Sequence, residues 1–431
     1  MKQTTDSLPG LVFRNCLFDL PLDYADPAKK TAVFARIVDV PGKEKADLPV
    51  MVFFQGGPGS GSPRPMGNTG WIKRVLQEYR LVLLDQRGTG LSTPVTAQTM
   101  RGLGTPQAQA AYLKNFRTDN IVRDAEAIRG QLIGDQPWSI LGQSYGGFCA
   151  MRYLSAAPGG LREVLITGGI PSLTRPTDDV YRATYQRVID KNRRYFQRYP
   201  GDVAKVKAIV RHLLDNEVKM PGGGRLTARR FLQLGLQFGM SDGFETVHYL
   251  IEEAFVDGVD GSHKQEMNWN FLFHLEQLQS FDTNPIFSLM QEACYTQQAA
   301  SNWSAERLLA EHPEFSLDRG DMVLFTGEMI YPWMFEVYPQ LQPLKQAADL
   351  LARDATWPML YDVDKLKQNR VPVAAAVYFD DMYVHREFSE ETARIVPNMK
   401  LWVTNQYEHN GLRADGEAVV ERLLQMVRGE V

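Results

Sequence analysis

Short apolar runs alternate with amphipathic segments over the first 170 residues of the chain. Residues 11–20 partly alternate between apolar and polar, and residues 33–40 are rich in β-branched residues, so both segments are predicted to be strands. Four later runs are apolar on both faces, as in the buried strands of a parallel sheet: residues 49–54, 81–84, 138–141 and 164–167. Apolar residues at helical spacing predict helices over 118–134 and 148–157. We therefore expect a mostly parallel sheet with crossover helices.

This alternation stops between residues 172 and 365, where the chain is mostly helical and rich in aromatic residues. It then resumes with two strands and two helices: residues 371–379, 389–396, 400–404 and 417–427. We predict one sheet domain, built from residues 1–171 and 366–431, with residues 172–365 inserted as a mostly helical cap domain. Two tandem domains are the alternative, but that arrangement leaves too few strands after residue 371 for a second sheet.

A glycine-bounded serine follows the third of these apolar runs. The segment Gly142-Gln143-Ser144-Tyr145-Gly146 fits G-x-S-x-G between a buried strand and a helix, which is the context that this motif requires. Glycines two residues on either side allow a sharp turn, and the positive N-terminal end of the next helix points at the serine. The pattern predicts Ser144 as a nucleophile. The alternative is a plain turn that contains an ordinary serine.

A glycine-rich loop, Gln55-Gly56-Gly57-Pro58-Gly59, follows the first apolar run. Acyl transfer needs two backbone N–H groups that converge on the developing oxyanion. In this architecture one comes from the residue after the nucleophile, here Tyr145, and the other from a loop after an earlier strand. Gly56 and Gly57 are the candidates for the second donor, although Gly-Gly-Pro-Gly is also good turn chemistry on its own.

Residues 85–92 form another glycine-containing loop, directly after the run 81–84. The loop contains no lysine and does not match G-x-x-x-x-G-K-[ST], so a phosphate-binding loop is not indicated. We expect a structural turn in which Arg87 is hydrogen-bonded internally.

The base and the acid of such a hydrolase follow the nucleophile in the order Ser, Asp or Glu, His. Two histidines lie after the predicted cap, His385 and His409. We choose His409 as the base, because it stands in a polar loop after the last predicted strand. The strand 371–379 ends at Asp380 and Asp381, and spacing alone does not separate these two. Asp381 is our choice for the acid and Asp380 the fallback.

Charge and cysteine content argue against several other classes of protein. The net charge is −4 with both signs interspersed, which gives no footprint for nucleic acid or an anionic membrane. The three cysteines form neither a disulfide framework nor a metal-binding pair, and no HExxH motif is present. The polar N-terminus lacks a signal-peptide core, and no apolar run approaches the roughly 20 residues of a membrane span. We expect a cytoplasmic protein, and a homo-oligomer is compatible with the sequence.

Four motifs occur in order along the chain: Gly56-Gly57-Pro58-Gly59, Asp85-Gln86-Arg87-Gly88-Thr89-Gly90-Leu91-Ser92, Gly142-Gln143-Ser144-Tyr145-Gly146-Gly147 and Asp381-Met382. Together they resemble the prolyl aminopeptidases (proline iminopeptidases), in particular their larger bacterial branch, over nearly the whole chain. The resemblance implies an α/β-hydrolase fold with a helical cap, and a serine exopeptidase that removes N-terminal proline from peptides without a metal or cofactor. It also favours Asp381 over Asp380, because the family's acid precedes a hydrophobic residue.

The resemblance further implies that glutamates of the cap bind the free imino group of the substrate. Glu292 and Glu328 look like these family residues, and a carboxylate pair would select a charged N-terminus. One departure is Gln55, because smaller relatives carry histidine before the glycine loop. The alternatives are an esterase or amidase with the same capped fold, or a non-catalytic binding protein on that fold.

Overall fold

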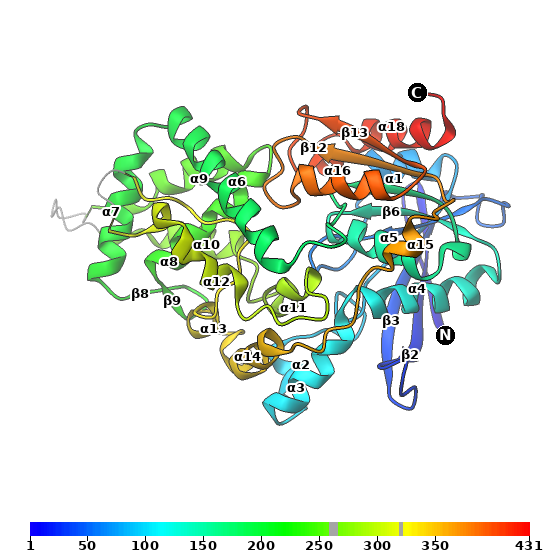
Figure 1. Cartoon of the computed structure of the whole chain (residues 1–431), viewed down its shortest axis with the longest axis horizontal. Helices are drawn as coiled ribbons and strands as arrows, with labels where there is room; N and C mark the ends of the chain where they lie inside the picture. The colour runs from blue at the N-terminus through cyan, green and yellow to red at the C-terminus, as the bar shows by residue number, and fades with distance from the viewer. Residues whose placement is uncertain (258–265, 319–321) are drawn as a thin grey trace.

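A nine-stranded sheet forms one half of the molecule, on the right in Figure 1. The computed structural model describes residues 1–257, 266–318 and 322–431. The strands of the sheet are β1 (Lys2–Leu8), β2 (Leu11–Pro21), β3 (Lys30–Asp39), β4 (Val50–Phe54), β5 (Arg80–Leu84), β6 (Trp138–Gln143), β7 (Leu161–Thr167), β12 (Val373–Tyr378) and β13 (Met399–Thr404). Their order is β1-β2-β3-β5-β4-β6-β7-β12-β13, with antiparallel pairing up to β5 and parallel pairing from β5 to β13. The predicted mostly parallel sheet is confirmed.

The central parallel strands are buried on both faces, which explains why the sequence contains continuous apolar runs there. Every residue of β4 and of β12 is buried. Met51 and Phe53 pack on one face of the sheet with helices α1 (Gly70–Leu76) and α18 (Gly416–Arg428). Val52 and Phe54 pack on the other face with α4 (Thr118–Ile133) and α5 (Tyr145–Ala156). The sheet is therefore the middle of three layers, and burial of apolar surface holds the layers together.

The predicted helices of this half occur in the structure. Helix α4 buries Ile121, Ala125 and Ile128, which recur at helical spacing, and ends at Gly134 with φ +64°. Residues 417–427 lie in α18 and residues 389–395 in α16 (Arg386–Ile395). The remaining α-helices of the sheet half are α2 (Ala97–Arg101), α3 (Pro106–Leu113), α15 (Val363–Leu366) and α17 (Gly411–Ala414).

Most of the chain between β7 and β12, with the exception of α15 and its flanking segments, forms the other half, on the left in Figure 1. Its helices are α6 (Thr177–Arg198), α7 (Asp202–Asp215), α8 (Ala228–Leu232), α9 (Gly243–Glu252), α10 (Trp269–Leu278), α11 (Pro285–Met290), α12 (Ser304–Leu308), α13 (Met334–Val337) and α14 (Lys345–Arg353), with a 3-10 helix, η3 (Gln233–Gly239). Two small antiparallel sheets pair β8 (Val218–Lys219) with β9 (Arg225–Leu226), and β10 (Phe255–Val256) with β11 (Glu266–Met267). Tyr195, Phe238 and Phe325 pack ring against ring at 4.7–5.8 Å, so aromatic side chains build a core for this half.

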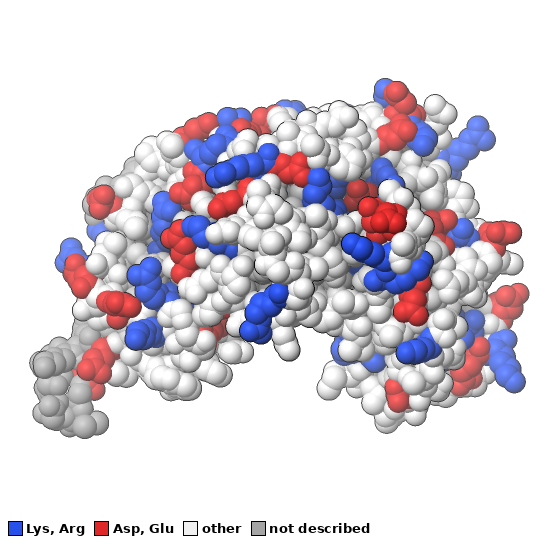
Figure 2. All heavy atoms as spheres, turned by 90° about the horizontal axis from the view of Figure 1, so that it is seen from below, with Lys and Arg blue, Asp and Glu red and all other residues white. Residues whose placement is uncertain are grey.

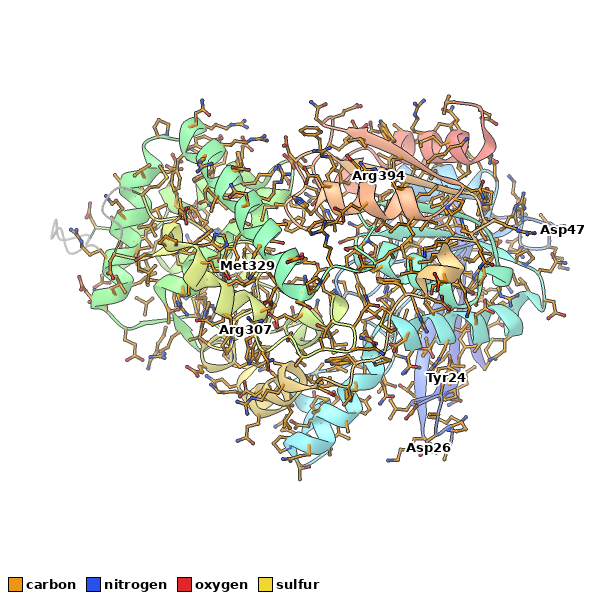
Figure 3. All side chains as sticks on the ribbon, in the orientation of Figure 1. Tyr24, Asp26, Asp47, Arg307, Met329 and Arg394 are labelled. Carbon is orange, nitrogen blue, oxygen red and sulfur yellow. The ribbon has the colours of Figure 1, made fainter. Side chains whose placement is uncertain are left out.

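The loop after β5 is fixed by a buried ion pair. Arg87 donates to both carboxylate oxygens of Asp124, at 2.7 and 2.6 Å, and neither side chain is more than 1% exposed. The same guanidinium donates to the main-chain carbonyls of Pro21, Leu22 and Asn115. Tyr24, labelled near strands β2 and β3 in Figure 3, donates its hydroxyl to Asp124 at 2.9 Å. The prediction that Arg87 is bonded internally is confirmed.

The face of the molecule seen from below carries both signs of charge without a large patch of either. Figure 2 shows Lys and Arg interspersed with Asp and Glu over the face seen from below. In the same view the surface is hollowed between the two halves, and the walls of the hollow are mainly uncharged. No helix in the described part of the chain is long and apolar enough to cross a membrane.

Candidate active site

Ser144 occupies the tight turn between β6 and α5. Its backbone has φ +54° and ψ −121°, and its N–H donates to the carbonyl of Thr167 on the neighbouring strand at 2.9 Å. The turn brings the chain so close to β4 that a Cβ on Gly146 would lie 1.9 Å from the carbonyl oxygen of Phe54. Only glycine fits there, which explains the second glycine of the sequence motif.

Three side chains from distant parts of the chain meet at the carboxyl edge of the sheet. His409 Nε2 lies 2.9 Å from Ser144 Oγ, and His409 Nδ1 lies 2.7 Å from Asp381 Oδ2. His409 is 5% exposed and Asp381 is 2% exposed. The serine, the base and the acid predicted from the sequence are thus hydrogen-bonded in series, as nucleophilic catalysis by serine requires.

The two neighbouring aspartates point in opposite directions. Besides contacting His409, Asp381 accepts hydrogen bonds from the main-chain N–H groups of Tyr383 and Val384 through Oδ1. Asp380 instead faces the other half of the molecule, where Arg194 donates to both of its oxygens at 2.8 and 3.0 Å. The structure therefore brings Asp381, and not Asp380, to the histidine.

The environment of His409 favours its protonated form. Burial by itself lowers the pKa of His409, but the charge and hydrogen bond of Asp381, together with the charges of Glu328 and Glu408, outweigh burial. The net effect holds the pKa above the usual value of histidine. An imidazole in this position can accept the Ser144 proton, and the resulting cation is stabilised by the adjacent carboxylates.

The glycine loop after β4 stands against the nucleophile. A Cβ on Gly56 would lie 3.1 Å from the Cβ of Ser144, and Gly57 lines both of the cavities that reach Ser144. Tyr145 is the first residue of α5, so its N–H is among those that the helix leaves without a helical acceptor. These placements agree with the predicted oxyanion donors, whose role stays a prediction.

Two cavities meet at Ser144. The larger has a volume of about 270 Å³ and is bounded by the glycine loop, η3 and the segment around Leu278 and Phe287. The smaller, about 10 Å³, lies between α5 and the cap half and is lined by Phe148, Cys294 and Tyr295. Glu328 borders both cavities. Its neighbour Met329, labelled in Figure 3, marks this segment among the helices of the cap half.

Glu328 is an acidic group held close to the triad in a poorly solvated place. Burial raises the pKa of Glu328 to about 8, and the charge of Asp381 adds to the rise, while His409 and the side chain of Gln291 oppose it. A carboxyl group with such a pKa is largely protonated at neutral pH in the free protein. A cation delivered beside it would favour the carboxylate form.

Glu292 lies in a different place from Glu328. Its Oε1 accepts the main-chain N–H of Ala305 at 3.0 Å near the start of α12, and the residue is 7% exposed. It lines a small cavity with Trp303 and Trp357, and it lines neither of the two cavities at Ser144. The structure does not bring Glu292 together with the triad, so its predicted contact with the substrate stays a prediction that the cavity linings do not support.

Several residues of the site were not identified from the sequence. Gln291 is buried, lines the smaller cavity beside Glu328 and opposes the rise in the pKa of that carboxyl. The ring of Tyr383 lies edge-on to His409 with centroids 4.7 Å apart. Tyr383 follows the acid by two residues, and this proximity is the only sequence signal that singles it out. Gln291 has no such signal, because its position depends on how the cap folds.

The cysteines of this chain are buried thiols, and one of them lies close to Ser144. Cys149 is fully buried one turn after Ser144, and burial raises the pKa of its thiol well above the usual value. All three cysteines are free and buried. Within residues 1–257, 266–318 and 322–431, no group of three or more His, Cys, Asp or Glu side chains could hold a metal ion.

A family model and several known proteins match this chain. The family model described as the alpha/beta hydrolase fold matches residues 49–249. A proline iminopeptidase of Aeromonas sobria is 48% identical over 423 residues, covering 98% of each chain. A proline iminopeptidase of Aspergillus aculeatus is 37% identical over 422 residues, covering 95% of this chain and 92% of its own.

Among solved structures, an alpha/beta hydrolase from a Medee basin deep-sea metagenome library aligns over 95% of this chain and 96% of its own, with 10% identity and a TM-score of 0.43. The sequence relatives are far closer. Given their identity over nearly the full length and the sheet that carries Ser144, His409 and Asp381, the chain belongs to the proline iminopeptidase family of α/β hydrolases.

Proposed function

We propose that this protein is a serine exopeptidase that releases N-terminal proline from peptides through an acyl-enzyme. The observation that carries the proposal is the hydrogen-bonded series Ser144–His409–Asp381 beside two cavities. The relatives named proline iminopeptidase, which match nearly the whole chain, support the choice of substrate.

The proposed reaction begins when His409 accepts the proton of the Ser144 hydroxyl. The Ser144 Oγ attacks the prolyl carbonyl carbon, and the oxyanion accepts hydrogen bonds from the N–H of Tyr145 and of Gly56 or Gly57. His409 then gives its proton to the leaving amine as the peptide bond breaks. Water, deprotonated by the same imidazole, hydrolyses the ester and releases proline. Asp381 holds the tautomer of His409 and stabilises its cation throughout.

Glu328 gives the proposed enzyme its preference for a free N-terminus. Its carboxylate borders the cavities at Ser144, where it would hold the protonated imino nitrogen of proline by a charge-assisted hydrogen bond. An internal proline carries an amide nitrogen in the same place and offers no such cation. Glu292 does not touch the substrate in this proposal. It adjoins Gln291, whose side chain opposes the rise in the pKa of Glu328.

We propose the same domain division as from the sequence, with residues 172–365 acting as a cap over the sheet domain of residues 1–171 and 366–431. Contact of Gly239 and Arg194 with the loops that carry His409 and Asp381 supports this arrangement. The cytoplasm is the proposed compartment, since all three cysteines are free thiols.

The decisive experiment compares substrates on wild type and Ser144→Ala. We expect prolyl arylamides to be cleaved faster than short acyl esters, Ser144→Ala to lose this activity, and a fluorophosphonate probe to label wild type but not Ser144→Ala. Replacing the exposed Ser7 by alanine is the matched control and should change neither result. Faster turnover of acyl esters would indicate the esterase alternative, and a lack of labelling would indicate a non-catalytic protein.

A further inference from the structure

A cationic face of helix α6 lies against the two loops that carry the base and the acid. Arg187, Lys191 and Arg194 are spaced by four and three residues, so they lie on one side of the helix. Lys191 Nζ lies 2.6 Å from Glu408 Oε1, and Arg194 donates to both oxygens of Asp380. Glu408 directly precedes His409, and Asp380 directly precedes Asp381.

The pair of Lys191 and Glu408 is the more enclosed of these contacts. The side chain of Lys191 is 2% exposed and that of Glu408 is 28% exposed, compared with 50% for Arg194. An ammonium group is buried this completely only where a partner compensates its charge. The cap thus pairs a buried lysine with one particular carboxylate, which stands next to the proposed base His409.

The loop that carries His409 is held by the cap on its other side as well. The main-chain N–H of His409 donates to the carbonyl of Gly239 at 3.1 Å, and Ser241 exchanges hydrogen bonds with Asn410 at 3.1 and 3.0 Å. Glu408, His409 and Asn410 are therefore each bonded to the cap half, so the position of the base depends on the cap.

The contact between Lys191 and Glu408 also affects the charge around the imidazole of His409. The titratable groups that face His409 are Asp381, Tyr378 and Tyr383 around the end of β12, Glu328 of the cap, and Glu408 on its own loop. Glu408 itself faces Lys191, Asp381 and Asp380. An uncompensated Glu408 carboxylate would add to the negative charges that stabilise the imidazolium, a form that cannot accept the serine proton.

We propose that Lys191 is a positioning residue of the active site, which anchors the His409 loop to the cap and cancels the charge of Glu408 beside the base. This inference rests on the proposed function, because it assumes that His409 is the base. Helix α6 of the cap would then help to set the pKa of His409, which belongs to the sheet domain.

The test uses pH profiles of kcat for a prolyl arylamide with three variants, because kcat reports the groups of the substrate complex, in which Glu328 is already paired with the substrate cation. Lys191→Met leaves the Glu408 carboxylate uncompensated, so we expect the acidic limb to move to higher pH, by about one unit, with about a tenfold loss on that limb. Glu408→Gln leaves the ammonium uncompensated, so the acidic limb should move to lower pH. The double variant Lys191→Met/Glu408→Gln should return the limb close to its wild-type position.

Arg193→Met is the matched control, because Arg193 is on the same helix but pairs with Asp190 at the surface. Its profile should match that of wild type. A purely structural role for Lys191 would lower activity at every pH without moving the limb, and that result, or shifts of the same sign in both single variants, would overturn the proposal. A Ser144→Ala variant that keeps its activity would instead refute the proposed function, so the two failures are distinguishable.

Discussion

At the scale of single residues, the nucleophile is held in a backbone conformation that serine rarely adopts. The φ of +54° at Ser144 costs about 1–3 kcal/mol in a residue other than glycine. Ser144 is held in this conformation because its N–H donates to Thr167 and its carbonyl accepts from Gly147 at 2.7 Å. The strained turn directs the Ser144 hydroxyl toward His409. The strain therefore lowers stability but aligns the reacting atoms.

The two adjacent aspartates provide a matched pair for testing the acid. Asp381→Asn removes the acceptor that fixes the tautomer of His409, so we expect kcat to fall by about three to four orders of magnitude. Asp380→Asn breaks a partly exposed ion pair worth up to about 1 kcal/mol, so the loss should stay below about fivefold. Steady-state kinetics on a prolyl arylamide would measure both. Equal losses in the two variants would contradict the assignment of Asp381.

Glu328→Gln should change both the pH profile and the stability of the protein. The carboxyl pKa of about 8 means that wild type must lose a proton before it can bind the substrate cation, so its kcat/KM should fall as pH drops below about 8. The variant should lose this dependence, and at high pH its kcat/KM should be about 10- to 100-fold lower, because a charged hydrogen bond is lost.

Deprotonation of Glu328 at high pH favours substrate binding but lowers the stability of the folded protein. In the unfolded chain the carboxyl ionises above its ordinary pKa, whereas the folded protein retains the proton up to about pH 8, so this group lowers stability as pH rises between those values. We expect Glu328→Gln to raise Tm by about 2–4 °C at pH 8 and less at pH 5, as measured by calorimetry. Glu292→Gln is the control for kinetics, since that carboxylate bonds to Ala305; a KM effect as large as that of Glu328→Gln would restore Glu292 as a substrate ligand.

At the scale of secondary-structure elements, predictability followed burial. Strands β4, β6 and β12 are covered on both faces, and this requirement leaves continuous apolar runs that the sequence displays directly. Strand β1 was not predicted, because all seven of its residues are exposed and their polar sequence, KQTTDSL, carries no hydrophobic alternation. Its place is set by pairing with β2, which is a long-range contact rather than a local pattern.

Some residues of the candidate site could likewise be identified from a local sequence pattern, and others could not. The turn around Ser144 and the polar loop around His409 are tied to strand ends, so a local pattern identified both residues. The choice between Asp380 and Asp381 came from a resemblance, since a one-residue difference reverses the direction of a side chain and spacing cannot decide it. The contact of Lys191 with Glu408 joins residues 217 positions apart, and only the docking of the cap creates it.

At the scale of the whole molecule, the two halves are joined by a buried arginine as well as by apolar contacts. Arg117, just before α4, is 1% exposed and donates to the main-chain carbonyls of Thr296 and Pro358 at 2.9 and 2.8 Å. Its guanidinium also lies 5.0 Å from the ring centroid of Trp357. Both accepting segments belong to the predicted cap, and Thr296 adjoins Tyr295 of the smaller cavity. One side chain of the sheet half thus fixes a wall of the candidate site.

Arg117→Met should therefore loosen the cap without touching the triad. Two buried carbonyls would lose charged donors worth about 1.5–3 kcal/mol each before relaxation, so we expect Tm to fall by about 3–8 °C. Displacement of the wall at Tyr295 should raise KM for prolyl arylamides more than it lowers kcat, because the reacting groups stay in place while the cavity changes shape. Arg123→Met, an exposed change in helix α4, which begins directly after Arg117, should leave Tm and KM near wild type. A drop in kcat at unchanged KM would show instead that Arg117 acts on the triad. In that case the cap would not only shape the cavity but would also help to hold the reacting groups, which we assign to the sheet half.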